Sequence, residues 1–450
     1  METITSRVTS GAGVHENQGI LSKIPGNTFS RSTISHLSLL DQHLFQRFGQ
    51  GPITQVPYRC MHHAFEAQVL ANPTAIAAAH KDQEITYEEL NNQANMLAAE
   101  LIDKGVKPGD NVGVFVQRSI PMLVGILATL KVGAAYAPQH IGIAPEEQLR
   151  YVMDSASIQC ILTISEFQHL VPKQENGVQI VIDTFLKSAK TKKKSYQNPD
   201  IEVSGDHVCY IIFTSGTTGM PNGVQVTHKN VCNILLTDPG NLGMRPGLKV
   251  GQILSIAFDM SVWEILGCLG NGATLVIRGK NIQETVSKVD IVISTPTILS
   301  SLDVSLCKNV RVAAVAGEPC PRVLAEKWSA FCAFYNSCGP TEVTIINTAQ
   351  RFFPTDDVLS IGKPTPNNTV YILDENMKPC AIGEIGEMWA GGDCVSAGYI
   401  NNEELNKTRY ADDPFLRNGR KMFRTRDLGK WTSDGAVSYT HLTLPTSAIV

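Results

Sequence analysis

The chain has 450 residues, of which 43% are hydrophobic, and it carries a formal net charge of −4 with an isoelectric point near 6.3. This length is typical of about three domain-sized units, and the slightly acidic balance excludes a basic surface for nucleic acid or anionic lipid. The eleven cysteines include no Cys-x-x-Cys pair, and no apolar stretch reaches bilayer length, so we expect a reduced, cytoplasmic protein without a membrane partner.

The N-terminal region has two predicted parts. Residues 1–36 are rich in serine, threonine, glycine and asparagine and poor in large apolar side chains. Such a segment cannot bury enough surface to offset the entropy of ordering, so it is expected to be disordered. Residues 37–57 contain apolar residues at helical spacing and are predicted to form a linker helix, with a short amphipathic surface helix as the alternative.

Alternating helix and strand patterns follow this helix. Thr86 and Glu89 form a capping-box pattern at the start of an amphipathic helix. A strand at 111–116 and an apolar helix at 121–131 come next, so the order predicts an α/β fold with parallel sheets covered by helices. Short strands separated by turn residues then predict a smaller β-rich subdomain at about 350–437.

Residues 210–223 carry the pattern of a phosphate-binding loop. A strand of β-branched and aromatic residues leads into a run of hydroxyls and glycines, namely Thr214, Ser215, Gly216, Thr217, Thr218 and Gly219. Glycine allows several backbone N–H groups to face one concave surface, and the hydroxyls add donors, so the loop predicts binding of a nucleoside triphosphate. Pro221 excludes the Walker pattern, and taken alone the loop is also typical of a solvated connection.

Five further motifs, in the same order, accompany this loop: residues 258–264, 316–319, 336–342, 383–387 with 398–399, and 423–428. Together they resemble the adenylate-forming superfamily, most closely the adenylation domains of nonribosomal peptide synthetases, over about residues 37–437. The resemblance implies an adenylation domain at 58–437 that contains two α/β subdomains and a smaller β-rich barrel. It also implies activation of an α-amino acid carboxylate by ATP, which gives aminoacyl-AMP and pyrophosphate.

The resemblance also implies residues that contact ATP. Thr214 and Glu342 match catalytic positions, and Glu342 matches the glutamate that ligates Mg²⁺, a cation that combines one or two carboxylates with phosphate oxygens. Asp427 matches the aspartate that accepts hydrogen bonds from the ribose hydroxyls. The other implied nucleotide contacts, each also compatible with an ordinary turn or strand end, are residues 215–219, Gly317, Glu318, Pro319, Asn336, Ser337, Cys338 and Thr341.

Asp259 indicates the class of substrate. It matches an aspartate that pairs with the α-ammonium of an amino acid, because a cation in a closed pocket needs a counter-ion. It also suits the N-cap of the helix expected to begin near Ser261. The other implied pocket residues are uncharged, which predicts an uncharged, largely apolar amino acid, although each alone is more typical of core: Met260, Trp263, Ile293, Ala314, Ala316, Ser337, Ile345 and Ile346.

The chain departs from the family pattern in several places. Asn222 replaces a lysine, Cys338 an aromatic residue and Arg426 a glycine, each beside the nucleotide, so weak or specialised turnover is expected. Residues 438–450 do not match the mobile C-terminal subdomain that the family places there and look foreign. We therefore expect this chain to bind ATP but to adenylate slowly. A carrier-protein domain is expected in the full-length protein and has no counterpart in this sequence.

Two alternatives remain open. An acyl- or aryl-CoA ligase of the same superfamily would use a substrate without an ammonium group and would need no carboxylate at Asp259. A non-catalytic nucleotide-binding fragment is the other alternative, and the three departures near the nucleotide favour it.

Overall fold

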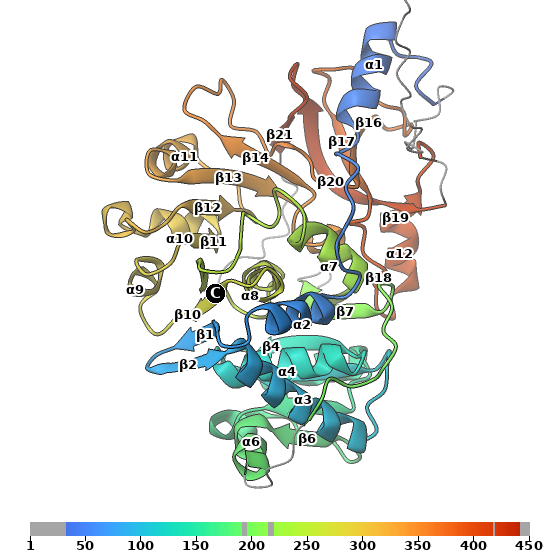
Figure 1. Ribbon diagram of the computed structural model, residues 1–450. Coiled ribbons are helices and arrows are strands. Elements are labelled where there is room, and N and C mark those ends of the chain that lie inside the picture. Colours follow the sequence, from blue (N-terminus) through green and yellow to red (C-terminus); the bar gives the residue numbers. More distant parts are fainter. Residues whose placement is uncertain (1–32, 191–195, 215–219, 417–418, 442–450) are drawn as a thin grey trace, which may run out of the picture.

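The computed structural model describes residues 33–190, 196–214, 220–416 and 419–441, and three sheets organise them (Figure 1). None of the helices in these ranges combines the length and apolar character that crossing a bilayer requires. The expected α/β fold is confirmed, since helices and mostly parallel strands alternate along the first three quarters of the chain.

One sheet has seven strands in the order β18-β8-β7-β4-β3-β5-β6. The strands from β7 to β6 are parallel, whereas β8 and β18 run antiparallel at one edge. Their bounds are β3 Asn111–Val116, β4 Ala135–His140, β5 Cys160–Thr163, β6 Val178–Val181, β7 Val208–Thr214, β8 Asn222–Thr227 and β18 Gly398–Tyr399. The strand predicted at 111–116 is therefore confirmed as β3.

A second sheet has nine strands in the order β15-β14-β13-β12-β11-β9-β10-β1-β2. Its central strands, from β13 to β1, are parallel. The bounds are β1 Ile76–His80, β2 Gln83–Thr86, β9 Lys249–Gln252, β10 Thr274–Ile277, β11 Ile291–Ser294, β12 Val312–Val315, β13 Ala333–Cys338, β14 Thr348–Phe352 and β15 Lys363–Pro364. Because β14 and β15 belong to this sheet, the separate β-rich part begins after the boundary expected near residue 350.

The third sheet is antiparallel and begins at β16. Its order is β16-β17-β20-β19, and β21 pairs with the other end of β20, so the described strands form an open sheet rather than a closed barrel. The bounds are β16 Asn368–Leu373, β17 Gly386–Gly392, β19 Tyr410–Asp412, β20 Lys421–Trp431 and β21 Val437–His441. The segment predicted to be foreign therefore contributes residues 438–441 to this sheet.

Helices cover the two large sheets. Helix α4 is buried at nearly every position and packs against α3, while α2 packs against α8. The capping box of Thr86 and Glu89 is present at the start of α3, as predicted. The helix bounds are α2 Met61–Ala71, α3 Tyr87–Asp103, α4 Ile120–Lys131, α5 Glu146–Ser155, α6 Ile182–Lys190, α7 His228–Leu235, α8 Met260–Gly270, α9 Ile282–Val286, α10 Pro296–Ser300, α11 Arg322–Ser329 and α12 Glu403–Arg409, with 3-10 turns η2 Ser165–Leu170, η3 Val304–Leu306 and η4 Thr341–Val343.

Helix α1, Leu39–Phe48, packs on the five-stranded sheet. It is shorter than the linker helix predicted for 37–57, because Gly49, Gly51 and Pro52 follow its last turn and do not favour helix. Ile34 is fully buried in the same small core as Phe45, so the packed structure begins before residue 37. Residues 1–32, which make up most of the segment expected to be disordered, lie outside the described residues.

Candidate functional site

The predicted site residues gather where parallel strands of the two large sheets end. Thr214 is the last residue of β7, Cys338 is the last residue of β13, and Gly317 follows β12. In open α/β sheets, ligands bind beyond the carboxyl ends of the strands. The geometry of the strands therefore agrees with the position expected for a ligand site.

The phosphate loop is described only at its two ends. Thr214 is half-buried, and its Oγ1 donates a hydrogen bond to the carbonyl of Asn222 at 3.4 Å. A second strand, β8, follows the loop and pairs with β7. Asn222, which stands where the family has lysine, accepts a hydrogen bond from Asn402 Nδ2 at 3.0 Å. Ser215, Gly216, Thr217, Thr218 and Gly219 lie outside the described residues.

Glu342 is held by residues from the strand β18 and its neighbourhood. It lies in η4, which packs against β8, and is only 8% exposed. The Tyr399 hydroxyl donates a hydrogen bond to Glu342 Oε1, and the Ser396 backbone N–H donates to the Glu342 carbonyl at 2.9 Å. Burial and the Glu342 carboxylate raise the pKa of Tyr399, so this phenol stays protonated and keeps its hydrogen bond.

Asp259 lies beside the same turn. It occupies the N-cap position of α8, yet its side chain makes no capping hydrogen bond, so the side-chain capping alternative is wrong. Burial, aided by the charge of Glu342, raises the pKa of Asp259 to about 6, while a hydrogen bond from Thr341 opposes this rise. The hydroxyl of Tyr210, which faces the charge of Asp259, is buried without a hydrogen-bond partner. The Tyr210 hydroxyl is therefore a buried, unused donor beside Asp259.

Asp427 lies within the same electrostatic neighbourhood. Burial is the main cause that raises its pKa to about 6, and Glu342 contributes, whereas Tyr439 and Arg409 lower it. Burial, and then the charge of Asp427, raise the pKa of the Cys338 thiol to about 12. Cys338 therefore lies beside Asp427 as a neutral thiol, where the family has an aromatic side chain.

Four of the predicted nucleotide contacts lie after β12 or within β13. Gly317 has φ +84°, a conformation that favours glycine, and it is exposed at the strand end. The carboxylate of Glu318 accepts hydrogen bonds from Thr297 N and Oγ1, at 3.0 and 2.6 Å, which leaves its own backbone free to border a ligand. Asn336 Nδ2 donates to Ser360 O at 2.7 Å, so this amide holds a neighbouring loop. Pro319 is exposed beside them.

The predicted substrate-pocket residues lie on α8, β11, β12 and β13 and just after β12 and η4, and all eight are buried: Met260, Trp263, Ile293, Ala314, Ala316, Ser337, Ile345 and Ile346. Trp263 is fully buried, and its Nε1 donates to the Gly240 carbonyl at 2.6 Å. Ser337 Oγ, by contrast, is buried without a hydrogen-bond partner. Some of these residues therefore pack in the core, whereas Ser337 retains an unused hydrogen-bond donor.

No role was predicted for Tyr399 and Tyr210 from the sequence, although both lie in motifs that the sequence analysis identified. The partner of Tyr399 is separated from it by more than fifty residues in the chain, and the pairing of β18 with β8 brings them together. A tyrosine that ends a short apolar strand pattern signals burial but not a partner. Only the fold supplies that information.

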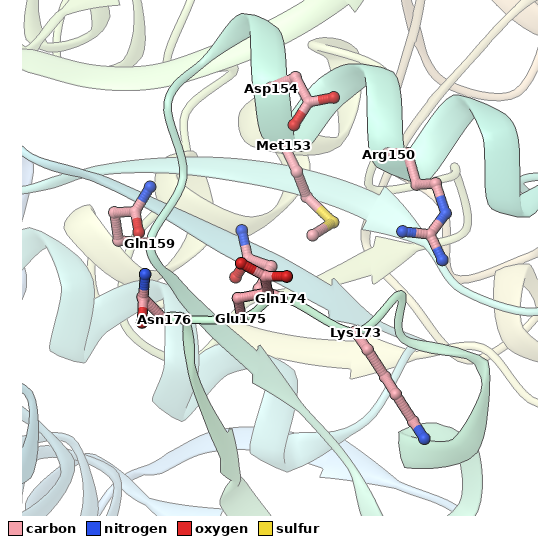
Figure 2. Close-up of a pocket in the computed structure, with 9 residues that line it drawn as sticks. Arg150, Met153, Asp154, Gln159, Lys173, Gln174, Glu175 and Asn176 are labelled. Atoms are coloured by element: carbon pink, nitrogen blue, oxygen red, sulfur yellow. The ribbon is translucent and has the colours of Figure 1, made fainter.

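A separate depression of about 370 Å³ lies at the far edge of the seven-stranded sheet, near α5 (Figure 2). Figure 2 shows side chains of both charge signs around it, including Arg150, Asp154, Lys173 and Glu175. Arg150 is already paired with Glu146, at 2.6 Å. No predicted site residue lines this depression, so it is distinct from the candidate site.

The carboxylates fit a bound Mg²⁺ only as minor ligands. Among the described residues, no group of three or more histidine, cysteine or acidic side chains is arranged to hold a metal ion. A single buried carboxylate, Glu342, suits a magnesium ion that is held mainly by phosphate oxygens and water. The metal would therefore enter with the nucleotide.

Comparisons with known proteins agree with this geometry. A family model described as AMP-binding enzyme matches residues 65–400. Adenylate-forming reductase 06235 of Coprinopsis cinerea is 45% identical over 90% of this chain, and gramicidin S synthase 1 of Brevibacillus brevis is 32% identical over 85% of it. The chain spans 40% and 35% of the lengths of these two relatives.

Solved structures show the same fold. A crystal structure of the nonribosomal peptide synthetase FmoA3 aligns with a TM-score of 0.81 at 24% identity, covering 90% of this chain and 45% of that chain. The N-terminal subdomain of NpsA from Klebsiella oxytoca aligns with a TM-score of 0.76 at 23% identity, covering 86% of this chain and all of that chain.

Proposed function

Because the chain belongs to the AMP-binding enzyme family, we propose that it activates a carboxylic acid with ATP, giving an acyl-AMP and pyrophosphate. The observation that carries this proposal is the placement of Asp259, Glu342 and Asp427, from three distant segments, close enough for the charge of Glu342 to raise the pKa of both other carboxyls. Acyl-AMP formation requires that two anions, a carboxylate and a triphosphate, are held in line. Acidic groups that face one another suit a site that closes around cations and the sugar hydroxyls of a nucleotide.

Each acidic residue has a distinct proposed role. Glu342, held by Tyr399, would ligate Mg²⁺, which neutralises the phosphate charge when it is bound. Asp427 would accept hydrogen bonds from the ribose hydroxyls, and these bonds would lower its raised pKa. Thr214 would donate its hydroxyl to a phosphate oxygen from the end of β7.

Asp259 supports an α-amino acid as the substrate. Its carboxylate does not cap α8, it is raised in pKa by burial, and it makes no ion pair with a side chain among the described residues. A substrate ammonium would provide the missing counter-ion and lower this pKa. The uncharged pocket residues favour an apolar side chain on that amino acid.

The same proposal assigns the bounds of the adenylating domain and its expected partner domain. Residues 58–437 would form the adenylating unit and residues 37–57 its linker, with a carrier-protein domain elsewhere in the full-length protein as the acceptor of the acyl group. All eleven cysteines are free thiols, and this favours a reducing, cytoplasmic setting.

A second candidate differs in the step that follows adenylation. Two relatives at 43–45% identity are named adenylate-forming reductases. The acyl group activated here would then be reduced by another part of the full-length protein. Product analysis with the full-length protein separates these outcomes, since reduction gives an aldehyde or alcohol and peptide synthesis gives an amide.

The test is ATP–pyrophosphate exchange with panels of amino acids and of fatty or aryl acids. We expect exchange with apolar amino acids, and Asp259→Ala should lower kcat/KM for them at least 100-fold, since a buried ammonium loses its counter-ion. Asp82→Asn, an exposed change in the turn after β1, is the matched control. Exchange with fatty or aryl acids alone would contradict the substrate class. Nucleotide binding without any exchange would favour a non-catalytic fragment.

A further inference from the structure

Basic residues from both large sheets contact the segment Gln252–Ser255, at the end of β9 and before α8. Arg118 lies two residues after β3, and its Nε donates to the Leu254 carbonyl at 3.0 Å. His140 ends β4, with its Nδ1 3.4 Å from Ser255 Oγ. Arg278 follows β10, and its backbone N–H donates to the Gln252 carbonyl at 3.1 Å.

The positive charges of this cluster oppose one another. Burial, together with Arg278, lowers the pKa of Arg118 to about 10. Burial and then both guanidinium groups lower the pKa of His140 to about 4, so the imidazole is neutral near pH 7. Two half-buried arginines therefore face each other across the junction of the sheets.

The acidic group that faces these arginines is Glu264, which is fully buried. Its two oxygens already accept hydrogen bonds from Gln252 Nε2 and from the backbone N–H groups of Ile253 and Leu254, at 2.8 to 3.3 Å. Burial raises the pKa of Glu264 to about 8, so it is a weak counter-ion for two arginines at neutral pH. The cluster keeps a net positive charge.

The cluster also has unused donors. Among the described residues, the Arg278 guanidinium makes no hydrogen bond or ion pair, and Arg118 uses only its Nε. Half-buried guanidinium N–H groups that lack an acceptor are costly, and planar N–H pairs match the oxygens of a phosphate group. A bound phosphate group would supply both the hydrogen-bond acceptors and the negative charge that these guanidinium groups lack.

The cluster lies near Thr214, the last residue of β7. In the seven-stranded sheet, β7, β4 and β3 are neighbours, and they lead to Thr214, His140 and Arg118 at the same edge. Neighbouring strands are about 5 Å apart, so His140 and Arg118 lie about one and two strand spacings from the β7 end.

We propose that Arg118, His140 and Arg278 form a second anion site, separate from the loop after Thr214, that binds a phosphate group. Two sources share this chemistry: the pyrophosphate released in the reaction, and a phosphate ester carried by another molecule. Assignment to released pyrophosphate rests on the proposed function, whereas anion binding itself does not.

The experiment is calorimetric titration of the full chain with inorganic phosphate and, separately, with pyrophosphate, each with and without a saturating non-hydrolysable ATP analogue. We expect pyrophosphate to bind with the analogue present, and Arg278→Met to weaken that binding at least tenfold. Lys280→Met removes the same charge from an exposed position two residues away and should change it less than twofold. Thermal unfolding of each variant checks that it is folded.

The outcomes distinguish pyrophosphate from a phosphate ester as the source of the phosphate group. They also distinguish a failure of the second anion site from a failure of the proposed function. Pyrophosphate bound at least tenfold more tightly than phosphate assigns the reaction product, and equal affinities assign a phosphate ester. Binding that the analogue abolishes, or that folded Arg278→Met retains in full, overturns the second site. An analogue that fails to bind would contradict the proposed function alone, because the titration without it still reports on Arg278.

Discussion

At the scale of single residues, Arg426 shows why the family favours glycine at its position. Arg426 has φ +66°, and it lies at an irregularity in the pairing of β17 with β20, directly before Asp427. This left-handed conformation is unfavourable for residues with a Cβ, and it aims the following carboxylate away from the regular strand alternation. The substitution that the sequence marked as a departure is therefore also a point of backbone strain.

Arg426→Gly should raise the free energy of unfolding by about 0.5–1 kcal/mol, because glycine adopts this φ without steric cost while its greater freedom in the unfolded chain removes part of the gain. Urea denaturation measures the change. Lys421→Gly, in a regular part of the same strand, should instead destabilise the protein. A loss of stability in Arg426→Gly as large as that in the control would contradict the strain argument.

The roles of Asp259, Glu342 and Asp427 could be proposed from sequence because each stands in a motif whose neighbours are adjacent in the chain. Their mutual proximity was expected only through the family resemblance, which assigns all three to one reaction, because no local pattern encodes how three distant segments come together. The same limit explains why Tyr210 and the Arg118 cluster had no predicted role.

At the scale of elements, the short turn η4 depends on β18. A two-residue strand paired to β8 supplies Tyr399, and the following segment supplies Tyr410, whose hydroxyl lies 2.7 Å from Ser396 Oγ. Ser396 in turn donates its backbone N–H to Glu342. These contacts fix the backbone and one carboxylate oxygen of Glu342, which lies in a 3-10 turn of only three residues.

Tyr399→Phe should weaken Mg²⁺ affinity in the presence of ATP about tenfold, because it removes the hydrogen bond that orients Glu342, an effect typical of groups behind a metal ligand. Calorimetric titration of Mg²⁺ into protein with ATP measures this affinity. Tyr410→Phe, which removes a hydroxyl that contacts Ser396 rather than the carboxylate, is the control. Equal Mg²⁺ affinities in wild type and Tyr399→Phe would remove Tyr399 from the site.

Local sequence patterns predicted individual helices and strands. The pairing of strands that are distant in the chain determined which sheet each strand joins. The capping box at Thr86 and the alternation at 111–116 are contained in a few adjacent residues, and both predictions hold. The transfer of β14 and β15 to the nine-stranded sheet depends on pairing with β13, which no local pattern encodes.

At the scale of the whole molecule, buried histidines tie α2 to α7. The Met61 backbone N–H donates to His228 Nδ1 at 3.3 Å, and the rings of His62 and His228 lie 5.4 Å apart. Burial is the main cause that lowers the pKa of both, with His228 at about 3, while His63, His207 and Lys131 also disfavour the charged forms. Both rings are therefore neutral in the folded protein.

The free energy of unfolding should fall as the pH decreases from about 6.5. The reason is that His62 and His228 bind protons in the unfolded chain at a pH where they stay neutral in the folded protein. Each such histidine contributes a slope of at most about 1.4 kcal/mol per pH unit, down to its folded pKa. His228→Gln should make the decline between pH 6 and pH 4.5 shallower than in wild type, measured by urea unfolding at several pH values. His43→Gln, an exposed change on α1, is the control, and identical slopes for wild type and His228→Gln would refute the argument.

The packing of α1 on the five-stranded sheet has a consequence during synthesis. Phe45 contacts Tyr371 and Phe415 in one small core, and Phe48 contacts Trp431 in another, so the two cores join the two ends of the described chain. On the ribosome, at roughly 5–20 residues per second, the aromatic rings of α1 emerge on the order of tens of seconds before their partners. A nascent chain would expose them throughout that interval, which makes this helix a natural point of attachment for a chaperone until translation brings β20 out of the exit tunnel.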